Sequence, residues 1–194
     1  MSKILLTSCD FRNEESAKFI YDNLPFPIHQ WRVLYFPNEK ATEAKIKSNK
    51  FHDRLSAFGF CKTNIYVFNY FCPSDFNAEN EIDVIYISGG NTFGTLKRIR
   101  ESGADKIILD YVSKGVTYIG GSAGAHIASR SIRHVSKYDI ETFGLTDFSG
   151  LNLFDGILIC HYNETRQSDY EHLIEQGENN IVTLRDQDYI IVEK

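Results

Sequence analysis

The sequence predicts an α/β protein, a three-layer sandwich in which a mainly parallel sheet lies between helices. Short apolar runs alternate with longer amphipathic runs along the whole chain. Several of the short runs are continuously apolar, which is typical of parallel strands buried on both faces. The chain has 194 residues and no internal repeat or Gly/Ser linker. We therefore expect a single domain over residues 1–194.

The elements follow from the length and periodicity of these runs. A run such as Ile4–Leu6 is too short for a helix and reads as the centre of a buried strand. The predicted strands, in chain order, are Lys3–Thr7, Gln30–Tyr35, Asn64–Phe68, Val84–Ser88, Thr117–Gly120, Gly156–Ile159 and Tyr189–Val192. The predicted helices are Asn13–Asn23, Ala41–Phe58, Thr92–Ser102, Ala104–Lys114, Ser122–Arg130 and Ser168–Gln176.

Composition and charge argue against several classes of protein. The net charge is -5, from 21 basic and 26 acidic residues, so no basic surface for nucleic acid or an anionic membrane is indicated. The apolar stretch near the N-terminus is too short for a signal peptide, and no run approaches the roughly 20 apolar residues of a membrane helix. We expect a cytoplasmic protein with no nucleic-acid or membrane partner.

The cysteines are scattered and contain no Cys-x-x-Cys pair. This spacing argues against a disulfide framework and a structural zinc site, and buried free thiols in a reducing compartment are the simpler expectation. No dinucleotide fingerprint is present either, so no metal or organic cofactor is expected. The four residues are Cys9, Cys61, Cys72 and Cys160.

Three loops carry the unusual residues. In open parallel sheets the ligand site lies beyond the carboxyl ends of the strands. The segments that follow Ser88, Gly120 and Ile159 read "SGGNTF", "GGSAGAH" and "CHYNETR". Polar, Gly-rich chemistry at three strand ends favours a shared site at that edge.

The segment Gly120–Gly124 fits the pattern G-x-S-x-G at a strand-to-helix junction. A nucleophilic serine on so tight a turn needs small neighbours, and the turn would expose its hydroxyl and aim backbone N–H groups at the same point. Ser122 is thus a candidate nucleophile. Two other readings remain open: a helix N-cap after a glycine turn, and a phosphate-binding turn that lacks the lysine of a Walker loop.

A serine hydrolase also needs an oxyanion hole and a base. The N–H groups of Ala123 and Gly90 are the candidate donors, while Asn91 or Thr92 would also cap the following helix. His161 follows the apolar strand "GILIC" and is the candidate base, because the other histidines fall in peripheral or polar segments or, like His126, on the helix after Ser122.

A carboxylate should orient the imidazole of the base. Asp186, in the turn before the last strand, is the best-placed acid, with Asp188 next.

With these motifs collected, the chain resembles the serine peptidase family of dipeptidase E and cyanophycinase. The resemblance covers nearly the whole length and is carried by "YISGGNTF", "GGSAGAHIAS" and "CHYNETR". It implies a fold like that of class I glutamine amidotransferases, which is flavodoxin-like. It also implies Ser122 as nucleophile, His161 as base, and Gly90 and Ala123 as the oxyanion hole.

The third member in dipeptidase E is a late glutamate, which Asp186 would replace here. The family also has an aspartate near an Ile-Arg pair after the nucleophile, which Asp139 matches with two extra residues between.

The chain departs from the family pattern in the substrate pocket. His126 stands where the family usually has asparagine, so a preference for N-terminal aspartate is not carried over. Arg166 is the candidate cation for an acidic substrate, the alternative being a salt bridge to Glu164 or Asp169. The substrate-binding candidates are Asn91, Thr92, His126, Asp139 and Arg166.

The sequence therefore predicts a serine-type peptidase, monomeric or homodimeric, that hydrolyses a dipeptide or short peptide through an acyl-enzyme on Ser122. A non-catalytic protein that binds a small metabolite on the same scaffold is the alternative.

Overall fold

The protein is described by a computed structural model, which covers residues 1–24, 26–140 and 142–194. Its main sheet has the strand order β3-β2-β4-β5-β1-β8. The first five of these strands run parallel, and β8 pairs antiparallel with β1. Their bounds are β1 Lys3–Thr7, β2 Val33–Phe36, β3 Ile65–Val67, β4 Val84–Ile87, β5 Thr117–Gly121 and β8 Tyr189–Glu193.

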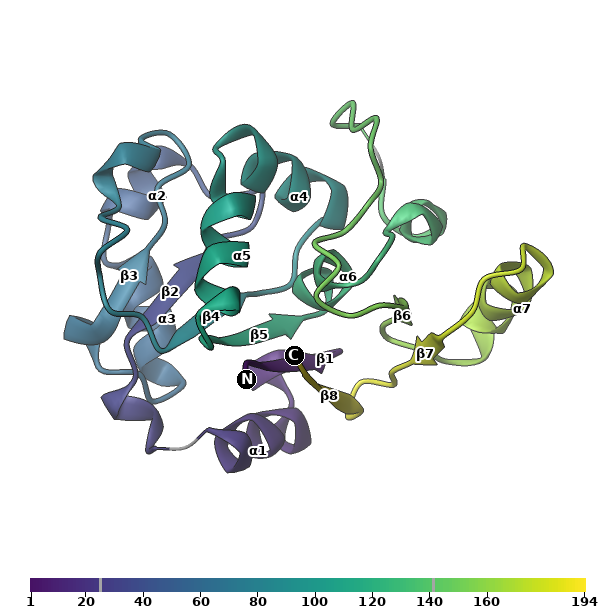
Figure 1. The fold of residues 1–194 in the computed structure, drawn as a ribbon, viewed down its shortest axis with the longest axis horizontal. Coiled ribbons are helices and arrows are strands. Elements are labelled where there is room, and N and C mark those ends of the chain that lie inside the picture. The colour runs from purple at the N-terminus through teal and green to yellow at the C-terminus, as the bar shows by residue number, and fades with distance from the viewer. Residues whose placement is uncertain (25, 141) are drawn as a thin grey trace.

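Helices cover both faces of this sheet, which confirms the predicted sandwich (Figure 1). Alternate residues of one strand enter opposite cores: Leu5 packs with α1, α2 and α3, while Ile4 and Leu6 pack with α4, α5 and α6. The helices are α1 Glu14–Asn23, α2 Glu43–Lys47, α3 Lys50–Ala57, α4 Thr92–Glu101, α5 Ala104–Ser113, α6 Ala123–Ala128 and α7 Gln167–Glu175. Among the described residues, none of these helices is long and apolar enough to cross a bilayer.

The last strand closes the sheet beside the first. Ser2 N donates to Lys194 O at 2.9 Å and Lys194 N donates to Ser2 O at 3.0 Å, so both ends of the described chain lie together (Figure 1). Residues along β8 alternate between exposed and half-buried, as expected for an edge strand. The β7–β8 turn is thereby held near the carboxyl end of β1.

Two predicted elements are corrected at their boundaries. The helix predicted over Ala41–Phe58 is two helices, because Ser48 is extended with ψ 169° and its hydroxyl both donates to Lys45 O and accepts from Lys50 N. Such local bonds compete with the helical pattern. The strand predicted from Gln30 begins only at Val33, because Ile28–Gln30 forms a 3-10 turn after Pro27.

The predicted strand Gly156–Ile159 is a strand, but it does not join the main sheet. β6 (Ile157–Ile159) pairs in parallel with β7 (Ile181–Thr183), a strand that the sequence analysis missed. Figure 1 shows β6, β7 and α7 extending from one end of the main sheet. The segments that follow β6 and β7 therefore approach the carboxyl end of β5 from outside the main sheet.

Candidate active site

Ser122 lies on a strained corner between β5 and α6. Its φ is 51° and its ψ is -108°, a conformation that L-residues rarely adopt. Its glycine neighbours have no room for a side chain: a Cβ on Gly124 would lie 2.1 Å from Ile87 O, and one on Gly121 would lie 2.5 Å from the Asp10 carboxylate. The small residues of G-x-S-x-G are thus explained by the close approach of β4 and of the segment after β1.

The hydroxyl of Ser122 does not cap α6, since no side-chain capping bond is present at this helix start. Instead Ser122 Oγ lies 2.9 Å from His161 Nε2. His161 also has a positive φ, of 53°, and its backbone N–H donates to Ser8 Oγ at 2.9 Å. The geometry therefore favours the nucleophile over the N-cap among the readings of this corner.

Among Asp186, Asp188 and the family-matched Asp139, it is Asp186 that contacts the ring of His161. Its Oδ1 lies 2.6 Å from His161 Nδ1. Asp188 accepts from Arg185 N at 2.9 Å and so shapes the turn, and Asp139 accepts from Thr92 N at 2.7 Å. The hydrogen bond from His161 lowers the pKa of Asp186. Asp186 is therefore ionised at neutral pH.

The loop Gly89–Asn91 is held from the segment after β2. Asn38 Nδ2 donates to Gly89 O at 3.0 Å, and Glu39 Oε2 accepts from Asn91 N at 2.9 Å. A Cβ on Gly90 would lie 2.6 Å from Asn38 Cβ, so only glycine fits there. Within the described parts of the chain, the N–H groups of Gly90 and Ala123 donate to no loop, cap or side-chain acceptor.

Asn91 and Thr92 serve the start of α4. Asn91 Oδ1 accepts from Gly94 N at 2.9 Å as the N-cap, and its Nδ2 donates to Ile140 O. Thr92 is 1% exposed, and its N–H is the group that Asp139 holds. In this structure Thr92 is not open to a substrate, whereas Asn91 and Asp139 line a surface cleft.

His126 is buried, with 2% of its surface exposed. Its Nε2 accepts from Cys160 N at 3.2 Å, so the ring proton lies on Nδ1, which faces Thr92 Oγ1 at 3.5 Å. Burial lowers the pKa of His126 well below its ordinary value, and the ring is neutral. In this structure the buried ring links the backbone before His161 to α4.

His134, which lies in a polar stretch of sequence, is also buried rather than solvent-facing. Its Nε2 donates to Leu158 O at 2.7 Å, and burial lowers its pKa to about 4.

Arg166 forms neither of the salt bridges considered for it. Its guanidinium lies 3.9 Å from the centre of the Tyr138 ring, and its Nη1 donates to Cys160 O. Asp169 instead pairs with Lys137 at 3.0 Å. Part of the Arg166 guanidinium is thus already bound within the protein, by the carbonyl of the residue before His161 and by an aromatic ring.

Two residues that sequence reasoning missed lie beside the Ser122–His161–Asp186 group, and both follow β1. Cys9 Sγ lies 4.0 Å from His161 Nδ1, and burial together with the charge of Asp186 raises the pKa of the thiol to about 11. Arg12 Nε donates to the fully buried Asp10 at 2.9 Å. A Cβ built on Gly89 would lie 2.8 Å from Arg12 Nη2 and 3.3 Å from Ser122 Cβ, so the guanidinium borders the serine. The rule about strand ends applies equally to β1 and would have selected them.

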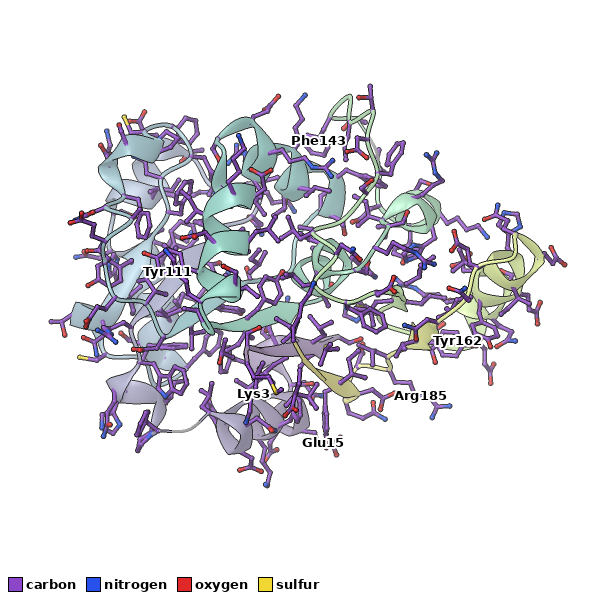
Figure 2. The ribbon with its side chains drawn as sticks, viewed as in Figure 1. Lys3, Glu15, Tyr111, Phe143, Tyr162 and Arg185 are labelled. Carbon is purple, nitrogen blue, oxygen red and sulfur yellow. The ribbon has the colours of Figure 1, made fainter. Side chains whose placement is uncertain are left out.

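One open cleft includes two members of this group, and a second lies beside the loop Gly89–Asn91. One, of about 820 Å³, is lined by His161, Asp186 and other residues that follow β6 and β7. Figure 2 shows two of its lining side chains, Tyr162 and Arg185, at the end of the molecule where α7 lies. The other, of about 590 Å³, is lined by Gly90, Asn91, Asp139 and neighbours.

Comparison with known proteins places the chain in a family. The family model described as peptidase family S51 matches residues 4–194. An uncharacterized peptidase of Listeria monocytogenes is 44% identical over 85 residues, which cover 43% of this chain and 42% of that protein. Peptidase E of Escherichia coli O1:K1 / APEC is 34% identical over 127 residues, which cover 60% of this chain and 55% of the enzyme. The matched segments thus span about half the length of these relatives.

Solved structures agree on the fold. A putative peptidase E from Listeria monocytogenes EGD-e has a TM-score of 0.71 at 22% identity, over 99% of this chain and 94% of the other. A peptidase from an acI-B1 actinobacterium has a TM-score of 0.59 at 14% identity, over 100% and 84%. The architecture is therefore the class I glutamine amidotransferase-like one that the sequence predicted.

Proposed function

Because the chain belongs to peptidase family S51, we propose that it is a serine-type peptidase that hydrolyses the amide bond of a dipeptide or short peptide. The observation that carries the proposal is the unbroken contact from Ser122 Oγ to His161 Nε2 and from His161 Nδ1 to Asp186 Oδ1, at 2.9 and 2.6 Å. A serine with a base, and a base with an orienting carboxylate, are what nucleophilic acyl transfer needs.

In the proposed reaction Ser122 Oγ attacks the carbonyl carbon while its proton passes to His161 Nε2. The ionised Asp186 accepts the Nδ1–H bond, which holds the ring in the tautomer that leaves Nε2 free and stabilises the imidazolium. The N–H groups of Gly90 and Ala123 would hold the oxyanion. His161 then protonates the leaving amine, the C–N bond breaks, and water releases the acyl group from Ser122.

The charges near Ser122 indicate which substrates fit. Arg12 borders the serine, and its Nε donates to Asp10. This bond holds the guanidinium cation in a fixed position. A small peptide with a carboxylate near its scissile bond matches this arrangement, and a dipeptide always has one. Arg166 is a second cation for the same role, with part of its guanidinium occupied by Cys160 O and Tyr138.

The test is covalent labelling. A fluorophosphonate should modify Ser122 in the native protein and leave Ser122→Ala unmodified, and a dipeptide library should show turnover only with the native protein. Asp186→Asn should keep the fold and lose most of the turnover, because the wrong ring tautomer is then stabilised. A native protein that resists the label and cleaves no dipeptide would instead support the metabolite-binding alternative.

A further inference from the structure

The peptidase reaction uses His161 Nδ1 and Asp186 but gives no role to the thiol of Cys9, which lies beside them. Cys9 Sγ, His161 Nδ1 and a carboxylate oxygen of Asp186 all lie within 4.8 Å of one another. They come from three parts of the chain, with Cys9 and His161 separated by 152 positions. Cys9 and His161 are half-buried and Asp186 is exposed, so the cluster is open to solvent on one side.

We propose that Cys9, His161 and Asp186 form a binding site for zinc, and that zinc bound there inhibits the peptidase. A thiolate, an imidazole and a carboxylate are the ligand types that zinc prefers, and three protein ligands leave the fourth position to water. The binding of zinc stands on the cluster alone, whereas the inhibition rests on the proposed function.

The present separations need little adjustment. Tetrahedral zinc with ordinary bond lengths places sulfur and nitrogen ligands ~3.5 Å apart, and nitrogen and oxygen ligands ~3.3 Å apart. Cys9 Sγ lies 4.0 Å from His161 Nδ1, and Asp186 Oδ1 lies 2.6 Å from it. The sulfur must move about 0.5 Å closer to the ring nitrogen and the carboxylate oxygen about 0.7 Å further from it. The Asp186 side chain, 65% exposed, is free to make the second of these movements.

The chemistry of inhibition follows from which ring nitrogen is taken. Zinc bonds to the lone pair of Nδ1, and the Cys9 thiol releases its proton to water. The single proton of the neutral imidazole then lies on Nε2, the atom that faces Ser122 Oγ. A protonated Nε2 cannot accept the serine proton, and Asp186 is withdrawn from the ring. The hydroxyl of Ser122 loses its base without any change in the fold.

Cobalt(II) provides a readout that does not depend on activity, because a thiolate bound to cobalt has a charge-transfer band in the near ultraviolet. The fully reduced native protein should develop this band with one equivalent of cobalt and lose it when zinc is added. Cys9→Ser should lack it. Cys72→Ser is the matched control, since Cys72 is exposed and outside the cluster, and should retain it.

Zinc should also slow fluorophosphonate labelling of Ser122 and dipeptide turnover, with recovery on addition of a chelator. Each variant is compared with its own metal-free rate. The inhibition constant for zinc should rise at least ~10-fold in Cys9→Ser and not in Cys72→Ser.

The two proposals fail separately. Absence of the band in the native protein, or an equal band in Cys9→Ser, would overturn the zinc site whether or not dipeptides are cleaved. A band that depends on Cys9 in a protein that never labels or cleaves would support the site and overturn the peptidase.

Discussion

The ring of His126 accepts the backbone N–H of Cys160, with 3.2 Å between Nε2 and N. This bond links the helix that follows Ser122 to the residue that precedes His161. Cys160 Sγ also lies 3.8 Å from Ser122 O, so the two segments touch at more than one point. The spacing between serine and imidazole thus depends on a buried histidine.

His126→Ala should lower kcat about 10–100-fold while KM changes little, because the base is displaced and the clefts are not. It should also cost about 1–3 kcal/mol of stability, since Cys160 N–H is left without a partner. Steady-state kinetics and urea unfolding measure these. His126→Gln, which can offer an amide oxygen to the same N–H, should recover part of kcat. A change confined to KM would show that His126 binds substrate.

The fold should lose stability in acid through His134. Its pKa is about 4 in the folded protein, below the value of about 6.5 in the unfolded chain. Below pH 6.5 the unfolded state binds a proton that the folded state does not, so the free energy of unfolding decreases as pH falls toward 4. The contribution is about 3 kcal/mol. Urea unfolding of His134→Phe should show a flatter slope over that range; an equal slope in both proteins would exclude His134 as its source.

Ser122→Gly should be more stable than Ser122→Ala, although both lose the nucleophile. The positive φ of Ser122 costs a residue with a Cβ about 1 kcal/mol, and glycine adopts it freely. Thermal unfolding of the two variants measures the difference. Equal stability would mean that the corner stores no strain.

Gly124→Ala should destabilise the protein by more than about 2 kcal/mol, because the new Cβ would meet the backbone oxygen of Ile87, which cannot move aside. Gly177→Ala is the matched control: no atom of the described residues lies within 4 Å of its Cβ, and its positive φ should cost about 1 kcal/mol. If the two variants unfold at the same denaturant concentration, the packing of α6 on β4 does not determine the backbone turn at Ser122.

Arg12 should select substrates by their carboxylate. Arg12→Lys keeps a cation beside Asp10 but loses the planar fork, so the preference for a dipeptide over its C-terminal amide should fall about 10-fold in kcat/KM. Arg166→Met should change this preference less, because Arg166 is already held by Cys160 O and Tyr138. A larger loss of this preference in Arg166→Met than in Arg12→Lys would show that Arg166 binds the carboxylate of the substrate.

Much of the fold could be predicted because its signals are local. Continuous apolar runs mark β1, β4 and β5, and amphipathic spacing marks α1, α4 and α5. β7 was missed because it is only Ile181–Thr183, half-buried, and pairs outside the main sheet. The break in α2–α3 depends on the Ser48 side chain, a choice between two local hydrogen-bond patterns that periodicity does not register.

The sequence by itself determined that a serine stands on a glycine-flanked corner and that a histidine follows a buried strand. Both features depend on residues that are adjacent in the chain, so the local pattern is enough to predict them. Only the tertiary structure decided which acid meets the histidine, that His126 and Thr92 are buried, and that Cys9 and Arg12 lie beside His161 and Ser122. These are relations between residues far apart in the chain, and the packing of the whole sheet brings them together.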